Sequence, residues 1–208
     1  MSNREAVAII DVGLGNIASI QRMMEKVGGK AYSAKSPDQL DRASKIILPG
    51  VGHFDEGMSR LREHGFEEVL VDFERSQQNH VMGICLGMQL LCRSSEEGDL
   101  PGLGLIDADV RKFRFPVESK LKVPHMGWNV VSASRASTLL PVRAEKQRFY
   151  FVHSYKVVPD DSDITIGIAN YGGEFCAAFQ QGNIFGVQFH PEKSHRFGME
   201  LMRRFIEL

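Results

Sequence analysis

Short, continuous apolar runs that end in glycine-rich turns constrain the fold of this chain more than any other feature. The runs occupy residues 7–10, 45–48 and 80–84 of 208, and each is followed by residues with helical spacing. A continuous apolar run of four or five residues is typical of a strand that is covered on both faces. Strands that alternate with helices pair in parallel through crossover connections. We therefore expect an α/β fold whose first half is a parallel sheet flanked by helices.

The predicted helices carry their apolar residues on one face. In the first of them, Ile17, Ile20, Met24 and Val27 recur at helical spacing, and Gly28 follows as a stop signal. Amphipathic patterns predict further helices over residues 54–64, 66–78 and 194–208, and a helix that begins within residues 85–92.

The second half of the chain has a different pattern. Segments typical of β-strands cover residues 106–113, 128–132, 148–158, 164–169 and 175–188, and turn signals such as 170–173 and 181–183 separate them. The sequence contains no internal repeat and no linker. We therefore expect residues 1–208 to form a single-domain, flavodoxin-like mixed sheet, parallel in its first half and partly antiparallel in its second.

Composition excludes several classes of protein. Lys and Arg number 25 and Asp and Glu number 26, so no excess of positive charge is available to recruit nucleic acid. The longest apolar-rich stretch, residues 81–92, is too short to span a membrane. Residues 1–5 are polar and lack the features of a secretory signal. Three cysteines without metal-ligand spacing fit a reducing compartment, so we expect a cytoplasmic protein without metal or cofactor.

One cysteine lies at a strand-to-helix junction. Cys85 has Gly83 two residues before it and Gly87 two residues after it, the pattern of a nucleophile elbow with sulfur in place of a serine oxygen. Such a turn presents the side chain at the carboxyl edge of the sheet, and the helix that follows favours the thiolate. The alternative is a small buried residue at a tight junction. Cys92, which we place on the same helix, and Cys176 lack flanking glycines and are interpreted as core residues.

A base for this cysteine is found near the end of the chain. His190 follows an apolar run, and Glu192 lies two residues later. In an extended segment both side chains project to the same side, so Glu192 could orient the imidazole and leave its other nitrogen for Cys85. A lone histidine is usually structural, but this pattern favours a catalytic triad of Cys85, His190 and Glu192.

A glycine-rich loop follows the second buried strand. Residues 49–52 read Pro-Gly-Val-Gly and belong to the same predicted sheet edge as Cys85. Backbone N–H groups of this loop and of Leu86 could stabilise an oxyanion. A phosphate-binding loop is the competing interpretation, but the Lys-Ser/Thr pair of a nucleotide P-loop does not follow. A simple turn is the third interpretation.

Taken together, these motifs resemble those of class I glutamine amidotransferases, and specifically the glutaminase subunits of imidazole glycerol phosphate synthase. The resemblance spans nearly the whole chain, and the segments that carry it are residues 11–16, 48–52, 83–89, 124–129, 150–155 and 188–194. It implies hydrolysis of glutamine by attack of Cys85 on the side-chain amide. It also implies an oxyanion region at Val51 and Gly52, with substrate contacts from Gln89, Glu97, His153, Ser154 and Tyr155.

The resemblance also implies a protein partner. Ammonia released into water at neutral pH becomes ammonium, which is not a nucleophile, so the glutaminase needs a synthase pressed against its active site. In the family this partner is a (β/α)₈-barrel cyclase that makes imidazole glycerol phosphate in histidine biosynthesis and forms a heterodimer with the glutaminase. The implied interface residues are Asn16, Trp128, Tyr150 and Lys193. Without the family context, Trp128 would be interpreted as a core residue.

Three alternatives remain open. Residues 148–150 and 195–199 resemble a related branch, the companion glutaminases of a sugar amidotransferase that modifies surface polysaccharides. A thiol peptidase could use the same triad, but it would need an open cleft where glutamine requires a small closed pocket. A non-catalytic, flavodoxin-like binding module would require the triad to be accidental.

Overall fold

The computed structural model describes residues 6–41, 43–75, 79–142 and 145–208. The first half contains β1 (Val7–Ile10), α1 (Ile17–Lys26), β2 (Ala31–Ala34), η1 (Pro37–Leu40), β3 (Lys45–Gly50), α2 (Phe54–Glu63), α3 (Phe66–Glu74), β4 (His80–Cys85) and α4 (Leu86–Leu90). The second half contains β5 (Cys92–Ser95), β6 (Ile106–Lys112), β7 (His125–Ala133), β8 (Gln147–His153), β9 (Tyr155–Pro159), η2 (Ser162–Ile164), β10 (Thr165–Asn170), β11 (Glu174–Gln181), β12 (Ile184–Val187), η3 (Pro191–Lys193) and α5 (His195–Glu207).

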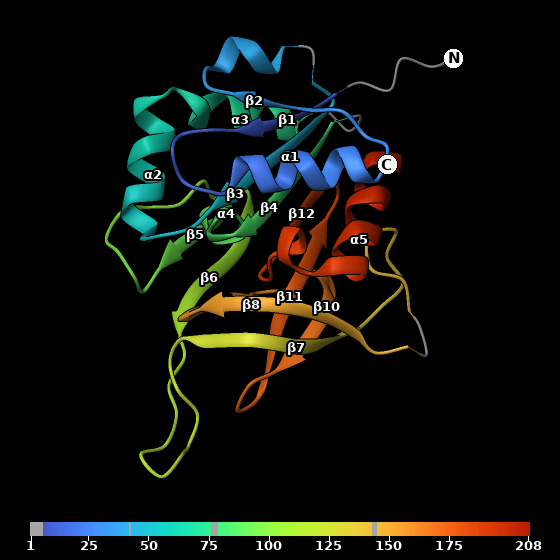
Figure 1. Cartoon of the computed structure of the whole chain (residues 1–208). Helices are drawn as coiled ribbons and strands as arrows, with labels where there is room; N and C mark the ends of the chain where they lie inside the picture. The colour runs from blue at the N-terminus through green and yellow to red at the C-terminus, as the bar shows by residue number, and fades with distance from the viewer. Residues whose placement is uncertain (1–5, 42, 76–78, 143–144) are drawn as a thin grey trace.

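The parallel part of the sheet has the order β2-β1-β3-β4-β12 (Figure 1). This is the flavodoxin-like strand order, and it places a topological switch point between β1 and β3. The prediction of a parallel first half is confirmed. The fifth parallel strand, however, comes from the far end of the chain, so β12 brings the residues that follow it beside the end of β4.

The rest of the sheet is mainly antiparallel, as expected. From β12 it continues through β11, β10, β7 and β8, while β9 pairs with both β11 and β6, and β5 pairs with β6. Two predicted strands are each divided in the structure. Residues 175–188 form a hairpin that turns at Gly182 with φ of 55°, and residues 148–158 are interrupted at Ser154.

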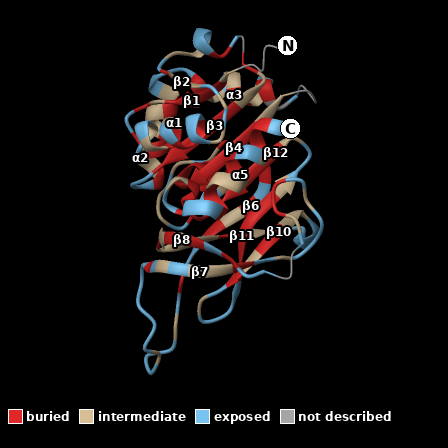
Figure 2. Ribbon diagram, turned by 45° about the vertical axis from the view of Figure 1, so that its right-hand side comes forward, coloured by how far each residue is buried: buried red, intermediate tan, exposed pale blue. Residues whose placement is uncertain are grey.

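Helices cover the two faces of the parallel sheet, and alternate strand residues point to opposite faces. Ala8 and Ile10 belong to the core cluster that includes residues of α2 and α3. Val7 and Ile9 belong to the cluster that includes residues of α1 and α5. Figure 2 shows the buried residues concentrated in the central strands, while the long loop between β6 and β7 is largely exposed. The strands are thus covered on both faces, as their continuous apolar runs predicted.

Several local predictions need correction. The strand β2 was not predicted, because its four residues form no continuous apolar run. The helix after Cys85 is only five residues long, so Cys92 begins β5 instead of lying on that helix, although it is buried as expected. The helix predicted over residues 66–78 ends at Glu74, and residues 76–78 lie outside the described part of the chain. None of the described helices is long and apolar enough to cross a membrane.

Candidate active site

Cys85 occupies a tight junction between β4 and α4. It is a non-glycine residue with positive φ (55°, ψ −108°), and it is 6% exposed. A Cβ atom added at Gly83 would lie 2.6 Å from the Gly87 carbonyl oxygen, and one at Gly87 would lie 1.8 Å from the Leu48 carbonyl oxygen. Real Cβ atoms do not approach backbone this closely, so both flanking glycines are required. This geometry agrees with the predicted nucleophile elbow, and a strained backbone at such a residue is typical of functional sites.

His190 and Glu192 meet as predicted, but by a different backbone path. Imidazole Nδ1 lies 2.8 Å from Glu192 Oε1, and the two side chains are 2% and 4% exposed. The prediction of an extended segment from His190 to Glu192 was wrong, because Pro191–Lys193 forms the 3₁₀ turn η3. Proline is tolerated at the start of a helical turn, where no N–H group is needed. The turn folds Glu192 back toward the imidazole instead of placing it along a strand.

The other imidazole nitrogen of His190 is left available for the cysteine. Nε2 is buried and has no hydrogen-bond partner among the described residues. Burial alone lowers the pKa of His190, but the interactions with Cys85 and with Glu192 outweigh it and raise the pKa to about 9. The imidazole is therefore protonated at neutral pH, and it can give its proton to a leaving group.

A cavity of about 270 Å³ opens beside Cys85. All eight residues that the sequence assigned to the oxyanion region and the substrate line it: Val51, Gly52, Leu86, Gln89, Glu97, His153, Ser154 and Tyr155. They come from loops and ends of elements that are far apart in the sequence, namely the segments after β3 and β5, the helix α4, and the junction of β8 with β9. Pro124 and Val152 complete the lining. The structure thus gathers the predicted residues around one small cavity.

Glu97 has a structural role in addition to its place in the cavity. Its Oε2 accepts a hydrogen bond from the Phe54 N–H at the start of α2, at 3.0 Å. In return, the Asp55 carboxylate accepts from the N–H groups of Asp99 and Leu100, at 3.1 and 3.0 Å. These backbone hydrogen bonds lower the pKa of Asp55. The reciprocal contacts fix the loop after β5 against α2, so Glu97 is held at the wall of the cavity.

His153 belongs to a buried chain of hydrogen bonds that also includes His125. His153 Nδ1 lies 2.7 Å from the Tyr155 carbonyl oxygen, which can only accept, so Nδ1 carries the hydrogen. Its Nε2 therefore accepts from His125 Nδ1 at 2.9 Å. Burial lowers the pKa of His153 to about 3 and that of His125 to about 4. Both rings are neutral at neutral pH. Sequence reasoning missed His125 because a polar residue in a strand gives no sign of which face it occupies.

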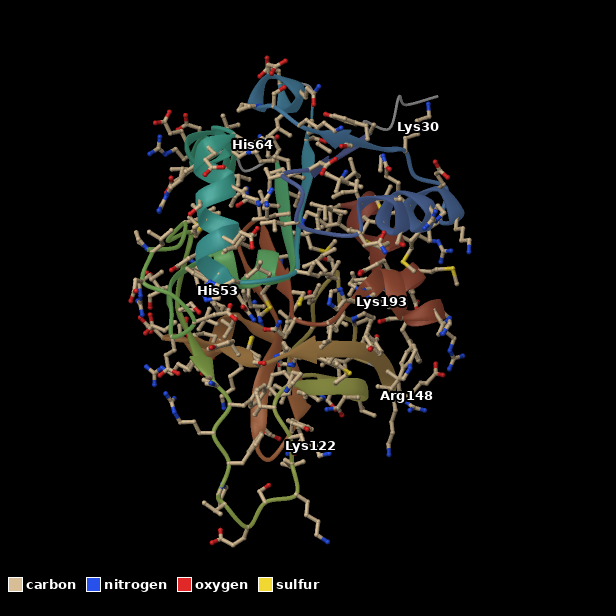
Figure 3. The ribbon with its side chains drawn as sticks, turned by 60° about the vertical axis from the view of Figure 1, so that its left-hand side comes forward. Lys30, His53, His64, Lys122, Arg148 and Lys193 are labelled. Atoms are coloured by element: carbon tan, nitrogen blue, oxygen red, sulfur yellow. The ribbon has the colours of Figure 1, made fainter. Side chains whose placement is uncertain are left out.

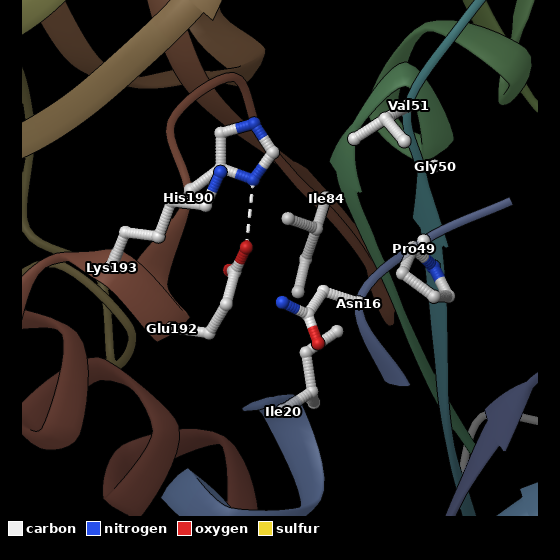
Figure 4. A pocket seen from close by; sticks show the side chains of 10 residues that line it. Asn16, Ile20, Pro49, Gly50, Val51, Ile84, His190, Glu192 and Lys193 are labelled. Atoms are coloured by element: carbon white, nitrogen blue, oxygen red, sulfur yellow. Dashed lines mark hydrogen bonds and ion pairs between the residues drawn. The ribbon is translucent and has the colours of Figure 1, made fainter. Parts of the chain in front are cut away.

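A second cavity, of about 330 Å³, is lined by His190 and Glu192 (Figure 4). Asn16 and Lys193, two of the four predicted interface residues, line it together with Val51. Asn16 also caps α1, because its Oδ1 accepts from the Ser19 N–H at 3.1 Å. This cavity occupies the carboxyl edge of β1 and β3, where open α/β sheets place their ligands.

Of the other two predicted interface residues, Tyr150 contacts the triad, and Trp128 lies against Tyr150. Tyr150 pairs with His190 in a β-bridge, and Lys193 Nζ lies 5.6 Å from the centre of the Tyr150 ring. Trp128 is 42% exposed and stacks on His195 with ring centres 5.3 Å apart, so it is not a core residue. It lines a groove of about 460 Å³ with Arg148, and Figure 3 shows Arg148 and Lys193 on the same side of the molecule. The four predicted residues are therefore near one another.

Gln188 is a site residue that sequence reasoning did not assign. It directly follows β12, it is fully buried, and its Nε2 lies 3.8 Å from Cys85 Sγ. Its position two residues before His190, at the end of a buried strand, was the available signal. A polar residue that continues an apolar run must find a partner inside the protein.

Comparison with known proteins agrees with this geometry. The family description "Glutamine amidotransferase class-I" matches residues 8–208. The fold is shared with the structure of PurLQS from Thermotoga maritima, with a TM-score of 0.72, 17% identity and coverage of 98% of both chains. The family match places the chain among the class I glutamine amidotransferases, and the solved structure has the same fold.

Two curated relatives identify the subfamily to which the chain is similar in sequence. "Imidazole glycerol phosphate synthase subunit HisH 2" of Pseudomonas aeruginosa is 50% identical over 202 residues, covering 97% of this chain and 99% of the relative. The protein of the same name from Methanococcus maripaludis is 48% identical over 201 residues, covering 97% and 98%. The chain therefore belongs to the class I glutamine amidotransferases and, within them, to the HisH subunit family.

Proposed function

We propose that residues 1–208 form one glutaminase domain, which hydrolyses glutamine to glutamate and ammonia and supplies a cyclase subunit that makes imidazole glycerol phosphate in histidine biosynthesis. The observation that carries this proposal is the elbow cysteine at the wall of a small cavity, next to a buried His190–Glu192 pair at 2.8 Å. Membership of the HisH family supports the synthase role.

In the proposed reaction, Cys85 Sγ attacks the side-chain carbonyl carbon of glutamine as a thiolate. The tetrahedral intermediate collapses as its C–N bond breaks, and His190 gives its proton to the departing nitrogen, which leaves as ammonia. A glutamyl thioester remains on Cys85. Water then attacks the thioester with His190 as base, the C–S bond breaks, and glutamate leaves. Glu192 keeps the imidazole oriented throughout and stabilises its charged form.

The walls of the cavity supply binding and electrostatic stabilisation. Backbone N–H groups of Val51, Gly52 and Leu86 are candidates to stabilise the oxyanion, and one such donor is typically worth about 3 kcal/mol in the transition state. Gln89, Glu97 and residues 153–155 are proposed to hold the substrate. A volume of about 270 Å³ suits a single amino acid, which favours glutaminase over peptidase activity.

The partner is proposed to cover the second cavity and the exposed Trp128. An aromatic residue that is 42% exposed and stacked on a second ring is the kind of anchor that protein interfaces use. Asn16 and Lys193 line the second cavity together with His190 and Glu192, and Tyr150 pairs with His190. A cyclase subunit with a (β/α)₈ barrel bound here would receive ammonia close to where His190 releases it, before water protonates it.

Steady-state kinetics with and without a histidine-pathway cyclase test the proposal. We expect glutamate release from glutamine, and, in the presence of the cyclase and its substrate, one imidazole glycerol phosphate for each glutamate. If glutamate is released but ammonia is incorporated only when a sugar amidotransferase replaces the cyclase, the partner assignment is wrong and the glutaminase assignment stands. If no glutamate forms under any of these conditions, the glutaminase proposal itself is wrong.

A further inference from the structure

A buried polar network reaches Cys85, and the triad does not use it. It consists of the side chains of Gln89 and Gln188, which are 4% and 0% exposed, and the carbonyl group of Tyr155. Gln188 is anchored by its own backbone, whose N–H donates to the Ala177 carbonyl at 2.9 Å. Two amide side chains buried in this way cost stability unless their polar atoms are paired, so each amide group needs a partner inside the protein.

The direction of every hydrogen bond in the network follows from the Tyr155 carbonyl. A carbonyl can only accept, so the group of Gln89 that lies 3.4 Å from it must be the NH₂. The same nitrogen lies 3.1 Å from the side chain of Gln188, so Gln188 presents its carbonyl oxygen there. The NH₂ of Gln188 is then the group 3.8 Å from Cys85 Sγ. The His153 N–H, which donates to the same Tyr155 carbonyl at 2.7 Å, helps to fix that carbonyl in place.

We propose that Gln188 is a further catalytic residue, whose side-chain NH₂ donates a hydrogen bond to the Cys85 sulfur and stabilises it as a thiolate. A donor is stronger toward a charged acceptor than toward a neutral one, so the contact favours the thiolate over the thiol. The same chain of hydrogen bonds commits both hydrogens of the Gln89 NH₂ to protein acceptors, and the carbonyl oxygen of Gln89 is left for the substrate. The inference rests on the proposed glutaminase chemistry, because it assigns Gln188 to the same nucleophile.

Gln188→Met tests the donor while keeping a side chain of similar length. The rate of Cys85 alkylation by iodoacetamide is measured between pH 5 and 10 by mass spectrometry of the Cys85 peptide, which separates it from Cys92 and Cys176. Loss of one hydrogen bond to a charged group is expected to move the midpoint of the alkylation profile up by about one pH unit, and to reduce the rate below the midpoint about tenfold. We expect kcat for glutamine to fall by a similar factor.

Gln147→Met is the matched control. Gln147 is also buried, at 6% exposure, and its NH₂ donates to a backbone carbonyl, that of Pro141, away from Cys85. Its alkylation profile should match that of the unmodified protein. A well-folded Gln188→Met variant with an unshifted midpoint would show that Gln188 only fills space and would overturn the proposal.

A second variant keeps the test decisive if Gln188→Met fails to fold. Gln188→Glu has the shape of the original side chain, but it places an oxygen where the NH₂ was. The midpoint is expected to rise by at least as much as for the Met variant, because the ionised carboxylate has no hydrogen to donate and repels the thiolate. An unshifted midpoint in folded Gln188→Glu overturns the proposal. Alkylation requires no glutamine turnover, so failure of the glutaminase assignment is recognised separately, by the absence of glutamate release in the unmodified protein.

Discussion

Replacing Cys85 with alanine is expected to reduce glutamine hydrolysis by roughly 10⁴- to 10⁶-fold, the scale on which removal of a catalytic nucleophile acts. Without the sulfur no thioester forms, and neither His190 nor the cavity can replace it. The fold should survive, because alanine retains the Cβ atom that already occupies the strained backbone with φ of 55°. Synthesis by the partner from added ammonia should also survive, because that reaction takes place on the other subunit.

The matched control for this prediction is Cys176→Ala. Cys176 is buried to the same degree, at 6% exposure, but it lies on β11, outside the cavity that Cys85 lines. Glutamate release by this variant should stay within a few-fold of the unmodified rate. Retention of glutamine-dependent synthesis by Cys85→Ala would refute the assigned nucleophile. Loss of ammonia-dependent synthesis as well would refute the division of labour between the two subunits.

Gly87→Ala is expected to cause a large loss of stability, although it adds only one methyl group. The new Cβ atom would lie 1.8 Å from the Leu48 carbonyl oxygen and 2.8 Å from its carbonyl carbon, both backbone atoms of the central strand β3. Neither can move without disturbing the pairing of β3 with β4. We expect the free energy of unfolding, measured by urea titration, to fall by about 3 kcal/mol or more, because overpacking against backbone cannot relax. Any folded fraction should also lose glutaminase activity, since Cys85 is two residues away.

Gly182→Ala separates this steric clash from the ordinary cost of replacing a glycine. Gly182 has φ of 55° and open space around its Cα. Its substitution should therefore lower the free energy of unfolding by only about 1 kcal/mol, the cost of placing alanine in the left-handed region. Gly87, by contrast, does not have a left-handed backbone, so the whole loss of stability in Gly87→Ala comes from the steric clash. Equal losses of stability in the two variants would contradict the close packing of the elbow against β3.

The elbow could be predicted from the sequence because its requirements are local. Few other geometries are possible for a buried strand that runs into a helix with glycines two residues before and after Cys85. The physical reason for the second glycine is that Gly87 lies too close to the Leu48 carbonyl oxygen for a side chain to fit. The apolar runs also predicted the buried strands β1, β3 and β4, although not their order in the sheet. The entry of β12 beside β4 could not be predicted, because pairing between segments about a hundred residues apart leaves no trace in either segment.

The wrong prediction at His190 to Glu192 and the two missed residues have the same cause, which is that contacts between distant segments decide them. Local signals predicted His190 to Glu192 as extended, but Pro191 starts a 3₁₀ turn that tertiary contacts hold. Ser194 is one of these contacts: its hydroxyl lies 2.6 Å from the His190 carbonyl and 3.0 Å from the Tyr150 N–H. Gln188 and His125 were missed for a related reason, since a polar residue in a strand acquires a role only when its neighbours from other elements are known.

Labelling with a glutamine-analogue electrophile tests the central claim, that Cys85 is a nucleophile facing a glutamine pocket, most directly. A diazoketone analogue of glutamine is incubated with the protein, and the adduct is located by peptide mass spectrometry. We predict one adduct per chain, on Cys85, which excess glutamine suppresses and Cys85→Ala abolishes. An adduct on Cys92 or Cys176, or labelling of Cys85 that glutamine does not affect, would contradict the assignment of this site.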